Sequence, residues 1–417
     1  MRRTPALLAV ICALFAILLI PTAAQAATRE QSCATMKALL TRGGGSASGL
    51  LVIDGETGEP VCSRAPGRSR SLASNMKLFT TATALARIGA TERIETTVES
   101  DGVIDRQGVL HGSLYLVGGG DPTLGTPAFY ERFLGGLGTN LFLLKRQIRE
   151  AGIGAITGRL YADDSVFDRL RGVADSGYGT SSYIGPLSGL ALNSGYSSAS
   201  GRSFASDPAK TAAATLARAL NGAGVRVSAK VALGTAPPFA TEIASVESPQ
   251  LTQIVNTTDV YSHNFFAEML IKLLGARFGG AGTTAAGAEV VEQFAQAHGS
   301  GLRAIDGSGL TRGNRASPAQ VVALLESMRE TPVGDEFIQD LALTGREGTV
   351  ASRMRGTAAY GRCRTKTGTL TGVSNLSGYC FNRSGRVMIF SILMNGVRDL
   401  GLAHLEQDLI AATVASY

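Results

Sequence analysis

The stretch SNMKLFTTATALARIG, residues 74–89, has apolar residues at helical spacing and ends at Gly89, a good helix cap. Ser74 and Lys77 are three positions apart, so a helix starting at Ser74 brings both side chains to one face. A lysine among apolar residues loses its proton more readily, and the neutral amine can then activate the serine hydroxyl. With only seven lysines, about half a Ser-x-x-Lys match is expected by chance, so the pattern needs support.

Support comes from Ser262-His263-Asn264, at the start of an apolar helix predicted over residues 262–274. We expect Ser262 to pass a proton between Lys77 and a leaving amine. The Asn264 amide can hold either a bound peptide or Lys77. Alone, Ser-x-Asn is most often an ordinary helix cap.

The third motif, Lys366-Thr367-Gly368-Thr369, lies on a predicted strand and is the most specific, with about 0.1 matches expected by chance. Such a strand can pair with an extended peptide. Lys366 supplies positive charge, Gly368 allows close approach to the backbone, and the hydroxyls of Thr367 and Thr369 can bind a carboxylate.

The motif order Ser-x-x-Lys, Ser-x-Asn, Lys-Thr-Gly is similar to that of penicillin-recognising serine enzymes. The first two motifs are 185 positions apart, from Lys77 to Ser262, far more than in a compact β-lactamase. The segments 119–124 (GGDPTL) and 306–312 (DGSGLTR) add to the likeness. The chain resembles the class C low-molecular-mass penicillin-binding proteins, which are D-alanyl-D-alanine carboxypeptidases and endopeptidases.

The resemblance implies an α+β, transpeptidase/β-lactamase-like fold, with a five-stranded antiparallel sheet flanked by helices. Residues 27–90 and 243–417 would form this catalytic domain, and residues 91–242 a large inserted region of mainly β or mixed structure. Within the insertion we expect short strands at 112–117 and 158–162 and one helix over 129–151. Outside it we expect a hairpin over 49–62 and strands at 362–370, 374–381 and 387–394.

The resemblance also assigns roles. Ser74 is the acylated nucleophile and Lys77 its base, Ser262 and Asn264 serve proton transfer and orientation, and Lys366 the electrostatics. The N–H groups of Ser74 and Thr369 would form the oxyanion hole. Arg312 would bind a side-chain carboxylate of the cell-wall peptide, and Asp163 its amino group. The implied ligands are peptidoglycan peptides ending in D-Ala-D-Ala, with β-lactams as covalent ligands; no cofactor or metal is implied.

Cysteine usage and the first residues indicate export. Arg2 and Arg3, the apolar run 6–20 and Ala24-Gln25-Ala26 form a predicted signal peptide over residues 1–26, leaving no permanent membrane span and an extracytoplasmic or periplasmic protein. An even set of cysteines then remains, which allows three pairings. We favour Cys33–Cys62 and Cys363–Cys380, because a two-residue turn at residues 371–372 places the second pair opposite each other on a hairpin.

Other function classes fit less well. The chain has four histidines, no His-Glu-x-x-His and no Gly-x-Ser-x-Gly, and no run of five basic residues that would indicate nucleic-acid binding. A serine β-lactamase remains an alternative, although no Asn follows a Glu by four positions. A non-catalytic cell-wall-binding relative is another. His263 stands where relatives often carry Asp or Asn; pointing into the cleft it would make activity depend on pH near neutrality, and pointing away it would have no effect.

Overall fold

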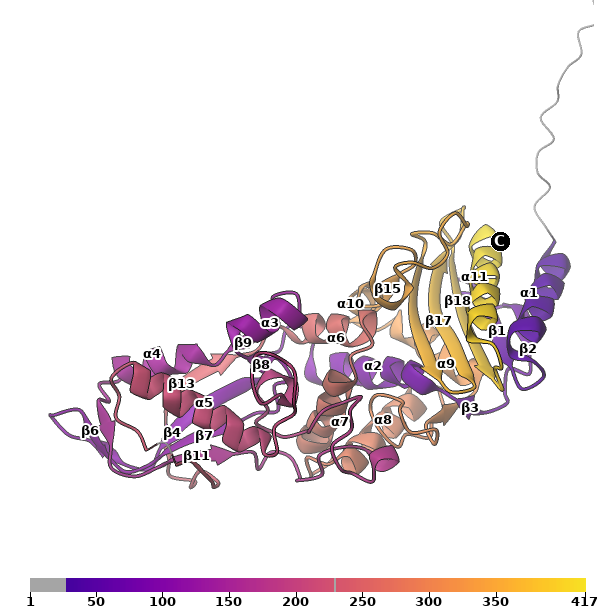
Figure 1. The fold of residues 1–417 in the computed structure, drawn as a ribbon. Coiled ribbons are helices and arrows are strands. Elements are labelled where there is room, and N and C mark those ends of the chain that lie inside the picture. The colour runs from indigo at the N-terminus through magenta and orange to yellow at the C-terminus, as the bar shows by residue number, and fades with distance from the viewer. Residues whose placement is uncertain (1–27, 229) are drawn as a thin grey trace, which may run out of the picture.

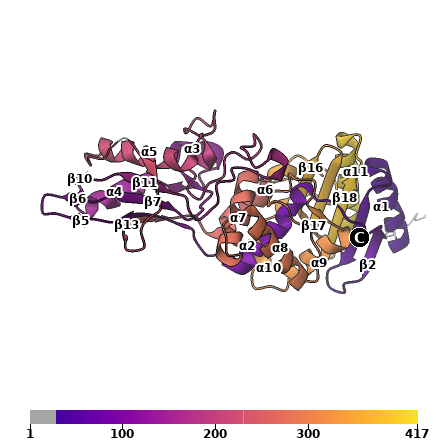
Figure 2. The ribbon, with the colours of Figure 1, turned by 90° about the horizontal axis from the view of Figure 1, so that it is seen from below.

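The computed structural model describes residues 28–228 and 230–417, so the predicted signal peptide lies outside the described residues. The chain forms two β-sheet regions with a group of helices between them (Figures 1 and 2). The first is a six-stranded antiparallel sheet of order β15-β16-β17-β18-β1-β2. Its strands are β1 (Gly49–Asp54), β2 (Pro60–Arg64), β15 (Ala342–Leu343), β16 (Cys363–Leu370), β17 (Val373–Phe381) and β18 (Val387–Asn395).

Both ends of the chain build this sheet, since β1 pairs with β18 along its whole length. Alternation along β18 explains the layers: Ile389 and Leu393 enter one apolar cluster, whereas Phe390 and Ile392 enter another on the opposite face. The terminal helices α1 (Arg29–Gly44) and α11 (Leu400–Ser416) cover the second face. The first face carries α2 (Met76–Ile88), α9 (Pro318–Met328) and behind them α6 (Leu251–Val260), α7 (Asn264–Phe278), α8 (Thr284–Ala297) and α10 (Gly334–Gln339).

The predicted α+β fold is confirmed, with one detail changed. The resemblance implied five strands, and the short β15 pairs with β16 to add a sixth at the edge. The hairpin β16–β17 has the predicted register: Leu370 pairs with Val373 across the Thr371-Gly372 turn, and Cys363 pairs with Cys380. Both favoured disulfides, Cys33–Cys62 and Cys363–Cys380, are present.

The inserted region contains a five-stranded mixed sheet of order β12-β11-β7-β4-β13 with its own apolar core. Its strands are β4 (Glu95–Ser100), β7 (Leu114–Gly118), β11 (Leu160–Asp163), β12 (Ala232–Leu233) and β13 (Thr241–Glu247). Smaller pairings join β5 (Val103–Ile104), β6 (Val109–His111) and β10 (Ala155–Ile156), then β8 (Leu124–Gly125) with β9 (Thr139–Asn140), and β3 (Arg70–Ser71) with β14 (Arg315–Ala316).

The predicted boundary at residue 242 falls inside β13, which pairs with β4 of the insertion. We therefore propose that the insertion ends near Ser248. The middle of the insertion, residues 167–187, also packs against helices of the other region. Phe167, Ile184 and Leu187 belong to the same apolar cluster as α2 and α7.

The prediction of one helix over residues 129–151 is wrong. The structure has α3 (Pro127–Phe133) and α4 (Phe142–Glu150), separated by a glycine-rich loop. Gly135 and Gly136 have φ angles of 60° and 90°, a left-handed conformation that glycine adopts readily and that ends a helix. A third helix, α5 (Pro208–Gly222), was not predicted from the sequence. Its start is nevertheless typical of a helix, because Pro208 occupies the first turn and the Asp207 side chain accepts the Lys210 N–H.

Candidate active site

Ser74 lies on a 3₁₀ turn (Ala73–Asn75) that leads directly into α2. The turn packs tightly against β16: a Cβ on Gly368 would lie 2.8 Å from the Leu72 carbonyl oxygen and 3.2 Å from the Ser74 nitrogen. Only glycine allows this approach. The Asn75 amide then ties the turn to the strand by donating to the Lys366 carbonyl at 2.9 Å.

Lys77 is fully buried and its amine reaches three oxygens. Nζ lies 3.1 Å from Ser74 Oγ, 2.8 Å from Asn264 Oδ1 and 2.8 Å from the Ser308 carbonyl oxygen. Burial, and next the positive charge of Lys366, lower the pKa of Lys77 to about 7. A large fraction of Lys77 is therefore neutral near pH 7 and able to accept the Ser74 proton.

Lys366 forms a second buried pair. Its amine donates to Ser262 Oγ at 2.9 Å and to the Thr367 carbonyl at 3.2 Å. Burial lowers the pKa of Lys366 to about 8, so it stays mostly charged at pH 7. The sequence predicts that Ser262 exchanges a proton with Lys77. In the structure the Ser262 hydroxyl accepts a hydrogen bond from Lys366, and the Asn264 side-chain oxygen accepts one from Lys77.

Ser262 itself lies just outside α7, which begins at Asn264 and not at residue 262 as predicted. Its φ angle is +57°, a left-handed conformation that is unusual for a serine and typical of functional sites. His263 is the helix cap: its Nδ1 accepts the Phe266 N–H at 3.4 Å. Burial, and then the nearby Lys77, lower the pKa of His263 to about 4, so the neutral imidazole is favoured at physiological pH and we expect no pH dependence of activity from His263 near neutrality.

A cavity of about 340 Å³ opens beside this site and is lined partly by the insertion. Ser262, His263 and Asn264 line it together with residues of the insertion, among them the aromatic Phe129 and Tyr196. The amide of Asn264 also donates to the Tyr183 carbonyl at 3.1 Å. The insertion therefore contacts the candidate site and forms part of the adjoining cavity.

The chain is similar to known proteins over most of its length. Residues 34–204 and 200–414 match the family described as "D-Ala-D-Ala carboxypeptidase 3 (S13) family". A D-alanyl-D-alanine carboxypeptidase from Actinomadura sp. (strain R39) is 32% identical over 89% of this chain and 82% of that protein. The chain belongs to the D-Ala-D-Ala carboxypeptidase 3 (S13) family.

A second relative and a solved structure add to the likeness. Carboxypeptidase DacB from Mycolicibacterium smegmatis is 27% identical over 88% of this chain and 79% of its own length. The fold is similar to that of penicillin binding protein 4 from Haemophilus influenzae, with a TM-score of 0.76 at 20% identity, covering 92% of this chain and 99% of that one. The family and the enzyme class predicted from the three motifs, a serine-type D-Ala-D-Ala carboxypeptidase, are thereby confirmed.

The remaining predicted residues are spread more widely. Thr367 donates its hydroxyl proton to Thr349 at 2.9 Å, and Thr369 is exposed farther along β16. Arg312 is exposed and donates to the Thr371 carbonyl, at the turn that ends this strand. Asp163 is buried in the insertion, where its two oxygens accept the N–H groups of Ser165 (2.9 Å) and Ala236 (2.8 Å). No contact within the described residues joins Asp163 to the catalytic cluster, so its role stays a prediction.

Three buried carboxylates near Lys77 were not predicted. Glu268 of α7 accepts the Ser308 N–H at 2.7 Å, and Asp306 accepts the N–H groups of Gly309 and Thr311. These contacts shape the loop whose carbonyl holds Lys77. Asp259 of α6 is the third. Asp306 belongs to the segment 306–312, which carries part of the family resemblance. No local sequence pattern indicates a role for Glu268 or Asp259.

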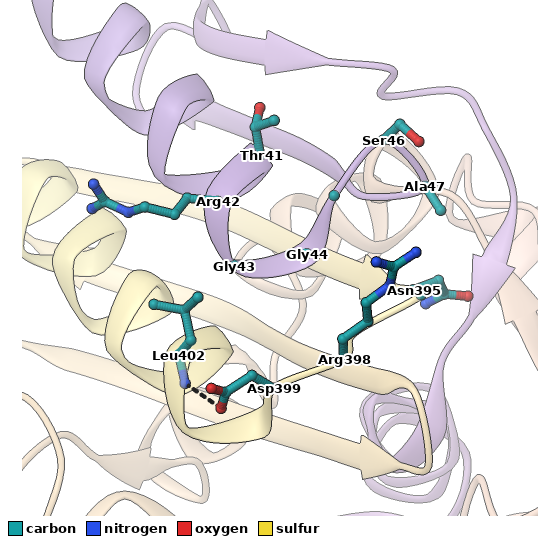
Figure 3. A pocket seen from close by; sticks show the side chains of 12 residues that line it. Thr41, Arg42, Gly43, Gly44, Ser46, Ala47, Asn395, Arg398, Asp399 and Leu402 are labelled. Atoms are coloured by element: carbon teal, nitrogen blue, oxygen red, sulfur yellow. Dashed lines mark hydrogen bonds between the residues drawn. The ribbon is translucent and has the colours of Figure 1, made fainter.

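A second cavity, of about 370 Å³, lies elsewhere, where the end of α1 meets the start of α11 (Figure 3). Arg398 and Asp399 line it, and Asp399 is already used as the cap of α11. None of the motif residues lines this cavity.

Among residues 28–228 and 230–417, no group of three or more His, Cys, Asp or Glu side chains could hold a metal ion. No helix in the described part of the chain is long and apolar enough to cross a membrane.

Proposed function

We propose that the chain hydrolyses peptidoglycan peptides ending in D-Ala-D-Ala through an acyl-enzyme on Ser74. The observation that carries the proposal is the buried Lys77 amine 3.1 Å from Ser74 Oγ. This base has a lowered pKa and is oriented by Asn264. Such a serine–lysine pair can activate the nucleophile without a histidine.

In the acylation step, Ser74 Oγ attacks the carbonyl carbon of the penultimate residue and its proton moves to neutral Lys77. The new C–O bond gives a tetrahedral oxyanion, which the N–H groups of Ser74 and Thr369 would stabilise. The C–N bond then breaks and the leaving amine takes up a proton. Water next attacks the ester, releasing the shortened peptide and restoring Ser74.

The bond between Lys366 and Ser262 supports a proton route to the leaving amine. The Ser262 hydroxyl, which accepts from the Lys366 ammonium at 2.9 Å, can donate its own proton outward. Lys366 would also attract the terminal carboxylate of the substrate, with the hydroxyls of Thr367 and Thr369 as further partners. Arg312, which donates to the Thr371 carbonyl at the turn of this hairpin, would contact a side-chain carboxylate of the cell-wall peptide.

The same chemistry predicts a long-lived covalent adduct with β-lactams, whose strained amide Ser74 would open. Structures of relatives include penicillin binding protein 4 from Haemophilus influenzae complexed with a β-lactam and a penicillin G acylated endopeptidase, Bd3459, from Bdellovibrio bacteriovorus. We propose export of the chain as well, supported by its two disulfides, because disulfides persist in oxidising compartments.

The test is intact mass after incubation with a fluorescent penicillin, on the wild type, Ser74→Ala and Ser71→Ala. We expect one stable adduct, mapped to Ser74, which Ser74→Ala abolishes. Ser71→Ala is the matched control, because the Ser71 hydroxyl is buried nearby without a hydrogen-bond partner, and should keep the adduct. An intact drug without adduct would indicate a non-catalytic binding protein, and a destroyed drug without adduct a β-lactamase.

A further inference from the structure

Asp259 is a buried carboxylate that the proposed mechanism does not use. It lies near the end of α6, three residues before Ser262, and has no exposed surface. Neither carboxylate oxygen has a hydrogen-bond partner among the described residues. The neighbouring Thr81 hydroxyl donates to the Lys77 carbonyl at 2.6 Å, so its proton is already used. A buried carboxylate without donors is costly and therefore unusual.

The groups that compensate for this burial are the two catalytic lysines. Burial raises the pKa of Asp259 to about 6, and the positive charge of Lys366, the Thr81 hydroxyl and the positive charge of Lys77 oppose that rise, in that order. In return, the Asp259 charge raises the pKa of both lysines against the effect of their own burial. For Lys366, Asp259 is the charged group that acts in this direction. The Asp259 charge therefore acts on both amines.

Other titratable groups face the same region. Asp340, which follows α10, accepts the Thr252 hydroxyl at 2.9 Å and repels Asp259. Glu268 and Asp306 act on Lys77, and Lys77 acts on His263. Lys77 thus has several nearby carboxylates, whereas Lys366 depends on Asp259.

We propose that Asp259 is a positioning residue that keeps one proton in the buried two-lysine site, held on Lys366 while Lys77 is neutral. This inference rests on the proposed function, in which Lys77 is the base and Lys366 the cation that attracts the substrate carboxylate. Asp259 touches neither Ser74 nor substrate and acts only through the lysines. It lies outside all three sequence motifs, which is why the motifs do not reveal it.

Loss of the Asp259 charge is expected to change the pH dependence of acylation on both sides of its maximum. Charged Lys366 is the active form, so acylation falls as pH rises through its pKa. Replacing Asp259 by a neutral residue removes a negative charge and lowers that pKa, so the fall begins at lower pH. Neutral Lys77 is the active form of the base, and its pKa also falls, so the rise on the acid side moves to lower pH too. The whole pH profile moves toward acid.

The test measures the second-order acylation constant with penicillin from pH 5 to 10 for the wild type, Asp259→Asn and Asp121→Asn. We expect Asp259→Asn to move the alkaline fall to lower pH by about one unit, which is about a tenfold loss above the new pKa. Asp121→Asn removes a buried carboxylate of the insertion that acts on neither lysine nor on Asp259, and should leave the profile in place. Asp259→Glu, which keeps the charge, should restore most of it. An unshifted profile in a folded Asp259→Asn would overturn the proposal.

A second measurement covers the case in which Asp259→Asn does not fold. The chain has only seven lysines, so the Cε resonances of ¹³C-labelled lysine in the wild type can be followed against pH, with Lys366→Arg and Lys77→Arg for assignment. We expect Lys366 to titrate at higher pH than Lys77. The reverse order would contradict the proposal. This readout needs no turnover, so it succeeds or fails independently of the proposed function.

Discussion

Two buried aspartates, one in each region of the molecule, are held in opposite ways. Asp121 in the insertion accepts the Thr123 N–H and the hydroxyls of Thr123 and Thr139. Asp259 beside the catalytic sheet accepts no hydrogen bond. Burial raises the pKa of each to about 6. The first carboxylate is satisfied by local donors, whereas the largest opposing effect on the pKa of the second is the positive charge of Lys366, on a distant segment.

The cores of the two regions also differ in the charge that they bury. The insertion core is built from apolar side chains such as Leu116 and Leu160, and its buried polar groups stabilise turns. The catalytic region instead buries Lys77 and Lys366 completely. Burial of charge costs stability but lowers a lysine pKa into the range needed for catalysis. The inserted region can be expected to respond to mutation mainly in stability, and the catalytic cluster mainly in rate.

The largest expected effect is in the catalytic cluster. Lys77→Met should slow acylation by penicillin about 10³-fold or more, because the base is lost. The melting temperature should not fall, since an apolar side chain replaces a buried amine. Acylation followed by intact mass, together with calorimetry, checks both. Lys37→Met on the exposed face of α1 is the control, and normal acylation by Lys77→Met would place the base elsewhere.

The converse effect is expected in the insertion core. Leu116 on β7 is fully buried, so Leu116→Ala should lower the free energy of unfolding by about 2–5 kcal/mol. The acylation constant of the folded protein should stay unchanged. Denaturant unfolding and acylation kinetics below the transition give the two numbers. Leu143→Ala, at a side chain that is 41% exposed on α4, should cost little. A slowed acylation in Leu116→Ala would mean that the two regions are not separable.

The smallest effect concerns a contact between the two regions. Lys272 of α7 is buried and pairs with Asp168 of the insertion, whose side chain is 23% exposed. Lys272→Met should lower the free energy of unfolding by about 1–2 kcal/mol, because water partly solvates the carboxylate that is left. Urea unfolding measures this, and Lys272→Arg should recover part of it. Acylation should be nearly unchanged, in contrast to Lys77→Met. An equal loss of acylation would show that this contact positions the active site.

Predictions from local patterns succeeded where the structure depends on neighbouring residues. The Ser74–Lys77 contact follows from a three-residue spacing on a helix, and the Cys363–Cys380 bond from a two-residue turn. The helix over residues 129–151 failed because its apolar spacing continued across glycines whose backbone adopts a left-handed conformation. In the insertion, strands of two to seven residues give too little periodicity for reliable prediction.

The sequence by itself determined the family, the fold class, the three motifs and the register that pairs Cys363 with Cys380, because each depends on residue types at short or fixed spacing; the Cys33–Cys62 pair was one of the open choices that the structure settled. Only the tertiary structure decided that Lys366 holds Ser262, that Asn264 holds Lys77, and that Asp259 lies near both lysines. These relations join segments more than 100 residues apart. Their energies depend on burial and on distances between charges, which no local pattern encodes.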